Sequence, residues 1–216
     1  MVVILLGPPG AGKGTQARCL AQHYNLRHIS MGEHLREEVK KGSDIGAIVC
    51  DFLKAGNLVP DEVTVRVVEG LIGENPKGII LDGFPRNLSQ ARSLIQIMGR
   101  HPEVELVIIE INTPDDEIIR RLTARRQCSK CNRIYNLITD PPKDDEICDE
   151  CKVKLIRRDD DKPEVIRNRL SLYHKETKPI IEYLKGHYPF YQVSGDIDAT
   201  SKQIMEIIDG HRPQVS

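Results

Sequence analysis

A glycine-rich stretch near the start of the chain carries the residues best suited to bind an anion. Gly7, Gly12 and Lys13 have the spacing G-x-x-x-x-G-K of a phosphate-binding loop, and the expected hydroxyl arrives one residue late, at Thr15. Glycines let backbone N–H groups point at a bound anion, and the lysine adds a point charge. The helix expected from Gln16 would add the positive end of its dipole. We expect a nucleoside triphosphate site rather than an ordinary glycine-rich turn.

A second candidate is an acid at the end of an apolar strand. Residues 79–82 read Ile-Ile-Leu-Asp, and the turn Gly-Phe-Pro-Arg follows. In proteins with a phosphate-binding loop, an acid placed like Asp82 holds Mg²⁺, usually through water. The alternative is an ordinary Asp that caps the next helix. The glycine-rich loop favours the magnesium role.

Arginines recur where the expected core meets two inserted segments. Two phosphate groups brought together carry several like charges, and guanidinium forks pair with phosphate oxygens better than ammonium groups do. Phosphoryl transfer needs positioning and charge more than acid–base groups. The alternative for any one arginine is a solvated surface position. The candidates are Arg36, Arg86, Arg121, Arg125, Arg158 and Arg169.

Two C-x-x-C pairs have the spacing of a four-cysteine zinc site. They are Cys128 with Cys131, and Cys148 with Cys151. Four thiolates leave no open coordination position, so the metal would be structural and would stabilise a segment with few apolar residues. Two disulfides or a redox pair are the alternatives. A nucleic-acid-binding zinc ribbon is a third, which the acidic residues around the second pair argue against.

These groups need a scaffold, and the short apolar runs indicate a doubly wound α/β core with a parallel sheet of about five strands. The expected strands are residues 2–6, 28–30, 79–82, 106–111 and 190–194. Ser30 and Glu33 form a capping-box pattern at the start of one helix. Another helix is expected to begin with Pro114 at its first position and to continue through Arg126. Helix is expected to resume near Pro163.

Two segments do not fit the alternation of strands and helices. Residues 30–59 are expected to form a helical insertion, whose second helix has an apolar face made by Ile45, Ile48, Val49, Phe52 and Leu53. Residues 122–161 contain the cysteines and a polar, proline-rich run, as functional lids and small inserted modules do. The core would then comprise residues 1–29, 60–121 and 162–216.

Composition limits the classes of partner. The 216 residues are 39% hydrophobic and 4% aromatic, with no tryptophan, which suits an aliphatic α/β core. The formal net charge of −1 provides no global basic field for nucleic acid or membrane. No basic leader precedes the first apolar run, and no run approaches the ~18 apolar residues of a membrane span. We expect a cytoplasmic protein with neither nucleic acid nor membrane as a partner.

Over essentially its full length, the chain resembles the adenylate kinases, in the bacterial-type form with a long zinc-binding lid. The motifs that carry the resemblance are, in order, GPPGAGKGTQA, SMGEHLR, NLVPDE, LDGFPRNLSQA, RRLTARR, CSKC, DPPK and RRDDDKPEVIRNRL. The resemblance implies a monomeric phosphotransferase that uses Mg²⁺ and catalyses ATP + AMP ⇌ 2 ADP. It makes residues 30–59 the segment that binds the nucleoside monophosphate, and residues 122–161 a lid that holds Zn²⁺.

The resemblance also implies roles for individual residues. The ATP side would be Gly10, Ala11, Gly12, Lys13, Gly14, Thr15, Arg121, Arg125, Ile134, Tyr135 and Ile197. The AMP side would be Met31, Arg36, Asn57, Leu58, Val59, Gly83, Phe84, Pro85, Arg86, Gln90, Arg158 and Arg169. The catalytic set would be Lys13, Asp82, Arg86, Arg121, Arg125, Arg158 and Arg169.

The acceptor segment departs from the family pattern at Met31. The family usually has Ser-Thr-Gly-Asp where this chain has Ser-Met-Gly-Glu at residues 30–33. A thioether in place of a hydroxyl removes a polar contact from the acceptor base or sugar. A UMP/CMP or GMP kinase is therefore the alternative within the class, although such relatives generally have short lids without cysteines. A zinc-ribbon module whose binding is regulated by ATP is a further alternative.

Overall fold

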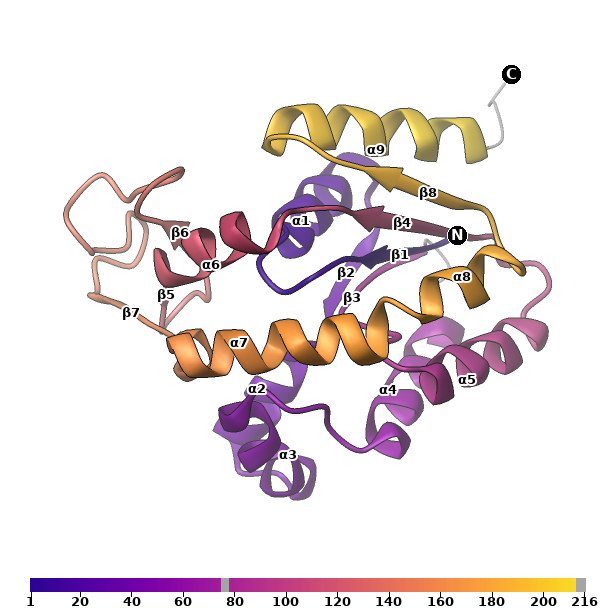
Figure 1. The fold of residues 1–216 in the computed structure, drawn as a ribbon, viewed down its shortest axis with the longest axis horizontal. Helices are drawn as coiled ribbons and strands as arrows, with labels where there is room; N and C mark the ends of the chain where they lie inside the picture. Colours follow the sequence, from indigo (N-terminus) through magenta and orange to yellow (C-terminus); the bar gives the residue numbers. More distant parts are fainter. Residues whose placement is uncertain (75–77, 213–216) are drawn as a thin grey trace.

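The computed structural model describes residues 1–74 and 78–212. Its centre is a parallel sheet in the order β2-β3-β1-β4-β8, with helices on both faces (Figure 1). The strands are β1 (Val2–Leu6), β2 (Arg27–Ser30), β3 (Ile79–Asp82), β4 (Leu106–Ile111) and β8 (Phe190–Val193). The five predicted strands are confirmed to within one residue at their ends. Residues 75–77 and 213–216, assigned to the core from the sequence, lie outside the described residues.

The two faces of the sheet pack against different helices. Alternate residues of β1 point to opposite faces: Val3 and Leu5 belong to one buried cluster, and Ile4 to the other. The first cluster includes α1 (Lys13–Tyr24) and α9 (Ile197–His211). The second includes α4 (Asp61–Glu74), α5 (Leu88–Gly99) and α8 (Ile180–Lys185). Burial on both faces explains why the strands are continuous apolar runs.

Between β2 and α4 the chain forms α2 (Met31–Lys41) and α3 (Asp44–Ala55). The two helices approach so closely at Gly46 that a Cβ there would lie 2.2 Å from the carbonyl oxygen of Glu38. The predicted apolar face of α3 is only partly covered. Val49 is buried, but Ile48 and Phe52 are 54% and 38% exposed.

One predicted cap in this region does not form. Ser30 stands at the N-cap of α2, yet its side chain makes no capping hydrogen bond within the described part of the chain. The Glu33 carboxylate lies instead 3.5 Å from a guanidinium nitrogen of Arg158. The capping-box prediction was wrong because a distant cation attracts Glu33 away from the helix end.

The cysteine-bearing segment forms a small antiparallel sheet in the order β6-β5-β7, at the left of Figure 1. Its strands are β5 (Arg125–Cys128), β6 (Ile134–Asn136) and β7 (Leu155–Ile156). The predicted helix through Arg126 was therefore too long: α6 (Asp115–Thr123) ends before β5, and Pro114 is its N-cap rather than its first residue. Arginine-rich sequence contains no helix breaker, so pairing with β6 and β7 decides the boundary.

This small sheet is joined to the core by α6 and α7 (Pro163–Leu172), the helix that was predicted to begin near Pro163. A separate buried cluster holds these two helices together, formed by Ile118, Leu122, Ile166 and Leu170. A π-helical turn, η2 (Tyr173–Thr177), follows α7. Within residues 1–74 and 78–212, no helix has both the length and the apolar character needed to cross a membrane.

Candidate functional site

The glycine-rich loop connects β1 to α1 at the carboxyl end of the sheet. Gly10 and Gly12 have φ values of 85° and 96°, a region that residues with a side chain rarely adopt. A Cβ on Gly7 would lie 2.5 Å from the carbonyl oxygen of Ile111. The Lys13 ammonium donates to the carbonyl oxygens of Gly7 (2.9 Å) and Pro8 (2.8 Å). The loop thus curls around its own lysine, with the start of α1 behind it.

The loop forms one wall of a cavity of about 520 Å³. Other walls come from α2, the turn after β3, the small sheet, α7 and the start of α9. Most residues selected from the sequence line it together: Gly10, Gly12, Lys13, Gly14, Thr15, Arg36, Leu58, Asp82, Gly83, Pro85, Arg86, Arg121, Arg125, Ile134, Tyr135, Arg158, Arg169 and Ile197. Residues far apart in sequence therefore meet around one space.

Among the described residues, six predicted site residues do not line the cavity: Ala11, Met31, Asn57, Val59, Phe84 and Gln90. Gln90 is buried, and its amide is already hydrogen-bonded. Its oxygen accepts from the backbone N–H of Arg86 (2.8 Å), and its nitrogen donates to the Asp61 carboxylate (2.8 Å). In this conformation Gln90 holds the turn that carries Arg86.

The buried lysine gives the cavity its first electrostatic feature. Burial lowers the pKa of Lys13 to about 8, although the Asp82 carboxylate acts in the opposite direction. Asp82 is next to the loop, since a Cβ on Gly14 would lie 3.3 Å from its Oδ2. Arg86 is held by a hydrogen bond from its Nε to the Gly83 carbonyl (2.8 Å), and burial also lowers its pKa. These charges would all be better solvated in water than here.

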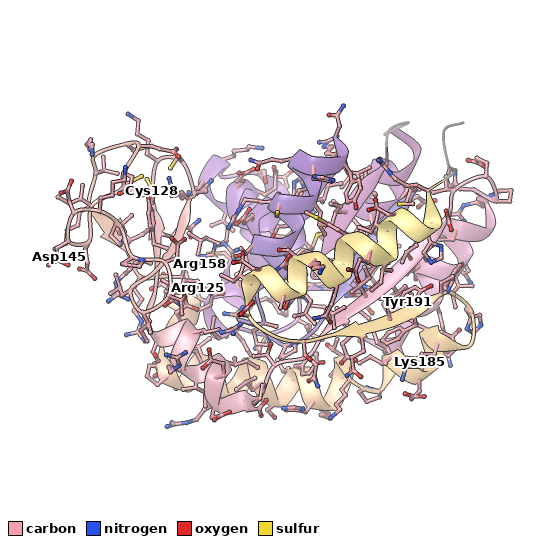
Figure 2. All side chains as sticks on the ribbon, turned by 90° about the horizontal axis from the view of Figure 1, so that it is seen from above. Arg125, Cys128, Asp145, Arg158, Lys185 and Tyr191 are labelled. Atoms are coloured by element: carbon pink, nitrogen blue, oxygen red, sulfur yellow. The ribbon has the colours of Figure 1, made fainter. Side chains whose placement is uncertain are left out.

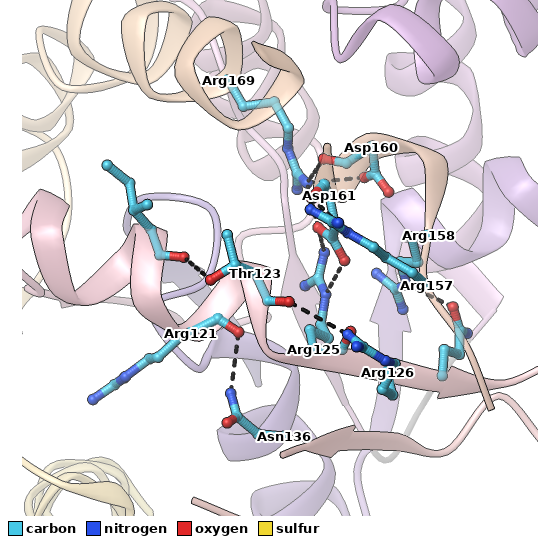
Figure 3. Close-up of polar contacts among 12 residues, drawn as sticks. Arg121, Thr123, Arg125, Arg126, Asn136, Arg157, Arg158, Asp160, Asp161 and Arg169 are labelled. Carbon is cyan, nitrogen blue, oxygen red and sulfur yellow. Dashed lines mark hydrogen bonds and ion pairs between the residues drawn. The ribbon is translucent and has the colours of Figure 1, made fainter. Parts of the chain in front are cut away.

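Two neighbouring aspartates hold the arginines on the far side of the cavity (Figure 3). Asp161 is 0% exposed and accepts two hydrogen bonds from Arg125, at 2.8 and 2.5 Å. Asp160 pairs with Arg169 at 3.0 Å and with Arg36 at 3.7 Å. Burial raises the pKa of Asp160, but the surrounding guanidinium groups outweigh it and the net shift is downward. The aspartates fix the direction of each arginine.

Arg158 comes from the end of the small sheet and lies near Arg125 (Figure 2). Its Nε donates to the Gln127 side-chain oxygen at 2.6 Å. Burial, reinforced by Arg125 and Arg36, lowers the pKa of Arg158 to about 9. Burial likewise lowers the pKa of Arg169 to about 10. Both remain protonated at neutral pH, so each presents a full positive charge at the wall of the cavity.

Another part of the cavity, around Arg121 and β6, is lined by fewer cations. Arg121 of α6 is oriented by Glu117, whose carboxylate accepts from its Nε at 2.7 Å. Ile134 and Tyr135 of β6 lie beside it, because the Asn136 amide donates to the Arg121 carbonyl at 3.1 Å. This part of the lining suits a flat, largely apolar group next to a planar cation.

The four cysteines of the two C-x-x-C pairs converge in the small sheet. Their sulfurs all lie within 4.8 Å of one another, and those of Cys131 and Cys148 are 3.7 Å apart. Tetrahedral ligands at a Zn–S distance of about 2.3 Å place neighbouring sulfurs about 3.8 Å apart. The backbone N–H groups of Lys130 and Cys131 donate to the Cys128 sulfur, and such hydrogen bonds favour the thiolate form. This cluster is a candidate metal site, and all six cysteines of the chain are free thiols.

Sequence reasoning missed several residues that shape the cavity. Asp160 and Asp161 stand in the motif RRDDDK, where a run of acids directly after two arginines was a usable signal. Tyr173 and Thr177 of the π-turn also line the cavity. Thr177 donates to the Arg86 carbonyl at 2.7 Å, a contact across a long sequence separation that no local pattern reveals.

Comparison with known proteins agrees with this geometry. The family described as adenylate kinase matches residues 5–188. An adenylate kinase of Kosmotoga olearia is 42% identical over 213 residues, covering 97% of this chain and 99% of the relative. Adenylate kinases of Acetivibrio thermocellus and Archaeoglobus fulgidus are 43% and 41% identical, each covering 97% of this chain and 99% and 98% of the relative. The chain therefore belongs to the adenylate kinase family.

Proposed function

We propose that the protein catalyses the reversible transfer of a phosphoryl group from ATP to AMP, giving two ADP, with both nucleotides bound in the one cavity. The observation that carries the proposal is the group of buried cations that face the cavity. Burial lowers the pKa values of Lys13, Arg158 and Arg169, so an anion that fills the space relieves an electrostatic cost. Several phosphate groups supply that charge.

The donor nucleotide occupies the side formed by the glycine-rich loop. Residues 10–15 hold the ATP phosphates with their backbone N–H groups, and Lys13 holds the terminal ones. The adenine lies at the less charged end, between Arg121 and the start of α9. Arg125 reaches the phosphates from the small sheet. Ala11 supports the loop from behind the lining.

The acceptor AMP occupies the side formed by α2 and the turn after β3. Arg36 and Arg86 bind its phosphate, while Arg158 and Arg169 bridge the two nucleotides. Residues 57–59 and 83–85, with Met31 and Gln90, form the support of its sugar and base. Gln90 keeps its place in the acceptor set because its amide fixes the Arg86 turn.

The chemistry assigned to the protein is positioning and charge neutralisation. The arginines stabilise the negative charge that develops on the transferred group, and their aspartate partners fix them before the substrate arrives. Enclosure of the cavity keeps water away from the phosphoryl group. No general base is required by this account.

Asp82 suits Mg²⁺, since it is a carboxylate at the strand end beside Gly14 and the phosphate-binding loop. The cation would neutralise charge on the ATP phosphates. The four cysteines suit structural Zn²⁺ because their sulfur spacing matches a closed tetrahedral site. Both ions belong to the proposal.

We also propose the division of the chain into a core (1–29, 60–121 and 162–216), a monophosphate-binding insertion (30–59) and a lid (122–161). The separate cluster between α6 and α7 supports the lid boundary. A monomer is proposed because the cavity is complete within one chain. A cytoplasmic location is proposed because reducing conditions keep the cysteines available for metal.

An acceptor panel tests the function. Mg-ATP is offered with AMP, dAMP, CMP, UMP or GMP separately, and formation of ADP is measured. We expect the highest kcat/KM with AMP. Preference for CMP, UMP or GMP would overturn the acceptor assignment, and lack of turnover with all of them would overturn the enzyme assignment.

A matched pair of variants tests the site. Lys13→Met should lower kcat/KM by at least a hundredfold, because it removes the cation at the donor phosphates. Lys185→Met changes an exposed lysine of α8 and should leave activity within twofold. Equal activity of the two variants would contradict the placement of ATP.

A further inference from the structure

Gln16 is the first residue after the glycine-rich loop, and it is not among the described residues that line the cavity. It is 2% exposed and lies on the face of α1 that packs against α9. Its amide nitrogen donates to the carbonyl oxygen of Ile197 at 2.8 Å. Its amide oxygen accepts from the Ser201 hydroxyl at 2.7 Å. A fully buried amide with both ends paired is costly to disturb.

The partners of Gln16 are all at the start of α9. Ile197 begins that helix, lines the cavity and is 44% exposed there. The preceding residue, Asp196, caps the helix by accepting from the backbone N–H of Ala199 at 2.8 Å. Among the described residues, the Gln16 side chain is the one that links α1 to the Ile197 carbonyl by a hydrogen bond.

Gln16 therefore fixes the spacing between two parts of one ligand site. Its backbone N–H bonds to the Gly12 carbonyl at 3.0 Å, so the residue moves with the loop that holds the phosphates. Its side chain sets the position of the wall at the adenine end. A nucleotide that bridges both parts needs this spacing to be correct, whereas a ligand that touches the loop alone does not.

We propose that Gln16 is a positioning residue for the donor base, acting through Ile197 at the start of α9. The inference rests on the proposed donor site and adds a specificity role for a residue without direct contact to the nucleotide. Loss of the amide should weaken binding of the donor base, whereas binding of the phosphates should be unchanged.

Gln16→Met removes both hydrogen bonds and keeps an unbranched side chain of similar length. Dissociation constants for ATP and for inorganic tripolyphosphate are measured by titration calorimetry. We expect the ATP constant to rise about tenfold, as for the loss of one well-formed hydrogen bond, and the tripolyphosphate constant to stay within twofold. In turnover, KM for ATP should rise while kcat and KM for AMP stay within twofold.

Tyr24→Phe is the matched control, because Tyr24 also ties α1 to α9, at the end remote from the cavity. Its hydroxyl donates to Asp209 at 2.8 Å and to the Met205 carbonyl at 3.1 Å. This variant should lower Tm without changing the ATP constant. Ser201→Ala removes one partner of Gln16 and should raise the ATP constant about threefold, which provides a test even if Gln16→Met does not fold.

Two results would overturn the inference. One is an equal loss of ATP and tripolyphosphate affinity in Gln16→Met, which would make Gln16 a support of the loop alone. The other is an unchanged ATP constant in both Gln16→Met and Ser201→Ala. Failure of the proposed function is a separate result, since it appears as a lack of ADP formation by the wild type.

Discussion

At the scale of single residues, folding buries several cations around the cavity, and burial makes their charged forms less stable than in water. Lys13 has a pKa of about 8 in the folded chain and a reference value of 10.5. Below pH 8 the cost of burying the ammonium is present in full. Between about pH 8 and 10.5 the unfolded chain binds the proton that the folded chain has lost, so this group makes the free energy of unfolding rise with pH. Bound phosphates remove the disadvantage by favouring the ammonium form.

This linkage predicts the pH dependence of ATP binding. Above pH 8 the free protein has lost the Lys13 proton and must regain it to bind phosphate well. The dissociation constant for ATP should therefore rise about tenfold between pH 7 and pH 9, with uptake of nearly one proton at pH 9. Calorimetry in buffers of different ionisation enthalpy measures both quantities.

Lys13→Arg provides the control for the pH prediction. A guanidinium keeps its charge throughout this range, so its ATP affinity should be weaker but nearly independent of pH. The same tenfold rise in this variant would assign the titration to another group.

The sequence was informative where chemistry and secondary structure are local. The glycine-rich loop, the strands and the cysteine pairs depend on neighbours in sequence, and these predictions agree with the structure. The small sheet was missed because β5 is arginine-rich and pairs with segments far along the chain. The burial of Met31 could not be read from its residue type either: its side chain is packed in the core cluster, and its role toward the acceptor stays a prediction.

At the scale of elements, the lid depends on very little apolar packing. Its buried cluster consists of Cys128, Tyr135, Cys148 and Leu155, so two of its four members are candidate metal ligands. A segment of this kind gains much of its folding free energy from the metal. The α6–α7 pair, which joins this segment to the core, has an apolar cluster of its own.

Replacement of one ligand tests this dependence. Cys128→Ser should lower Tm by about 10 °C, because it weakens metal binding in a lid with few other stabilising contacts. Turnover at moderate temperature should change little. Differential scanning calorimetry and metal analysis of the purified protein provide the measurements.

Cys19 offers a matched control for this replacement. It is exposed on α1 and lies outside the cluster, so Cys19→Ser should leave both Tm and metal content unchanged. Comparable melting temperatures for Cys128→Ser and the wild type would contradict the proposal that metal binding stabilises this segment.

At the scale of the whole molecule, the two inserted segments contact each other. Lys40 of α2 donates to the Asn132 side chain at 3.3 Å, and Glu33 approaches Arg158 at 3.5 Å. On another side, Asn168 of α7 donates to the Ala55 carbonyl at 2.9 Å. These contacts between residues 30–59 and 122–161 are polar, and Arg36 adds an ion pair with Asp160 at 3.7 Å. Attraction between charged groups therefore contributes to holding the two segments together.

High ionic strength should therefore weaken the attraction between the two inserted segments in the protein without nucleotides. Salt screens exposed charges over a Debye length of about 3 Å at 1 M, against 10 Å at 0.1 M. We expect the radius of gyration from small-angle X-ray scattering to increase between 0.1 and 1 M KCl for the protein without nucleotides. The protein saturated with ATP and AMP under non-turnover conditions should show little change. A radius that is independent of salt in both states would contradict charge-held closure.

The surroundings of Tyr135 should make the tyrosine fluorescence of the protein sensitive to metal binding. The Tyr135 phenol donates to the Cys148 sulfur at 3.5 Å and accepts from the backbone N–H of Asp149 at 2.9 Å, and its side chain is buried among the cysteines. The chain has six tyrosines and no tryptophan, so no indole emission hides the phenols. A thiolate that accepts from a phenol alters its emission, and occupation of the sulfur by a metal changes that interaction. Ultraviolet fluorescence of the unlabelled protein should thus follow metal loading of the lid, with Tyr135→Phe as the silent reference.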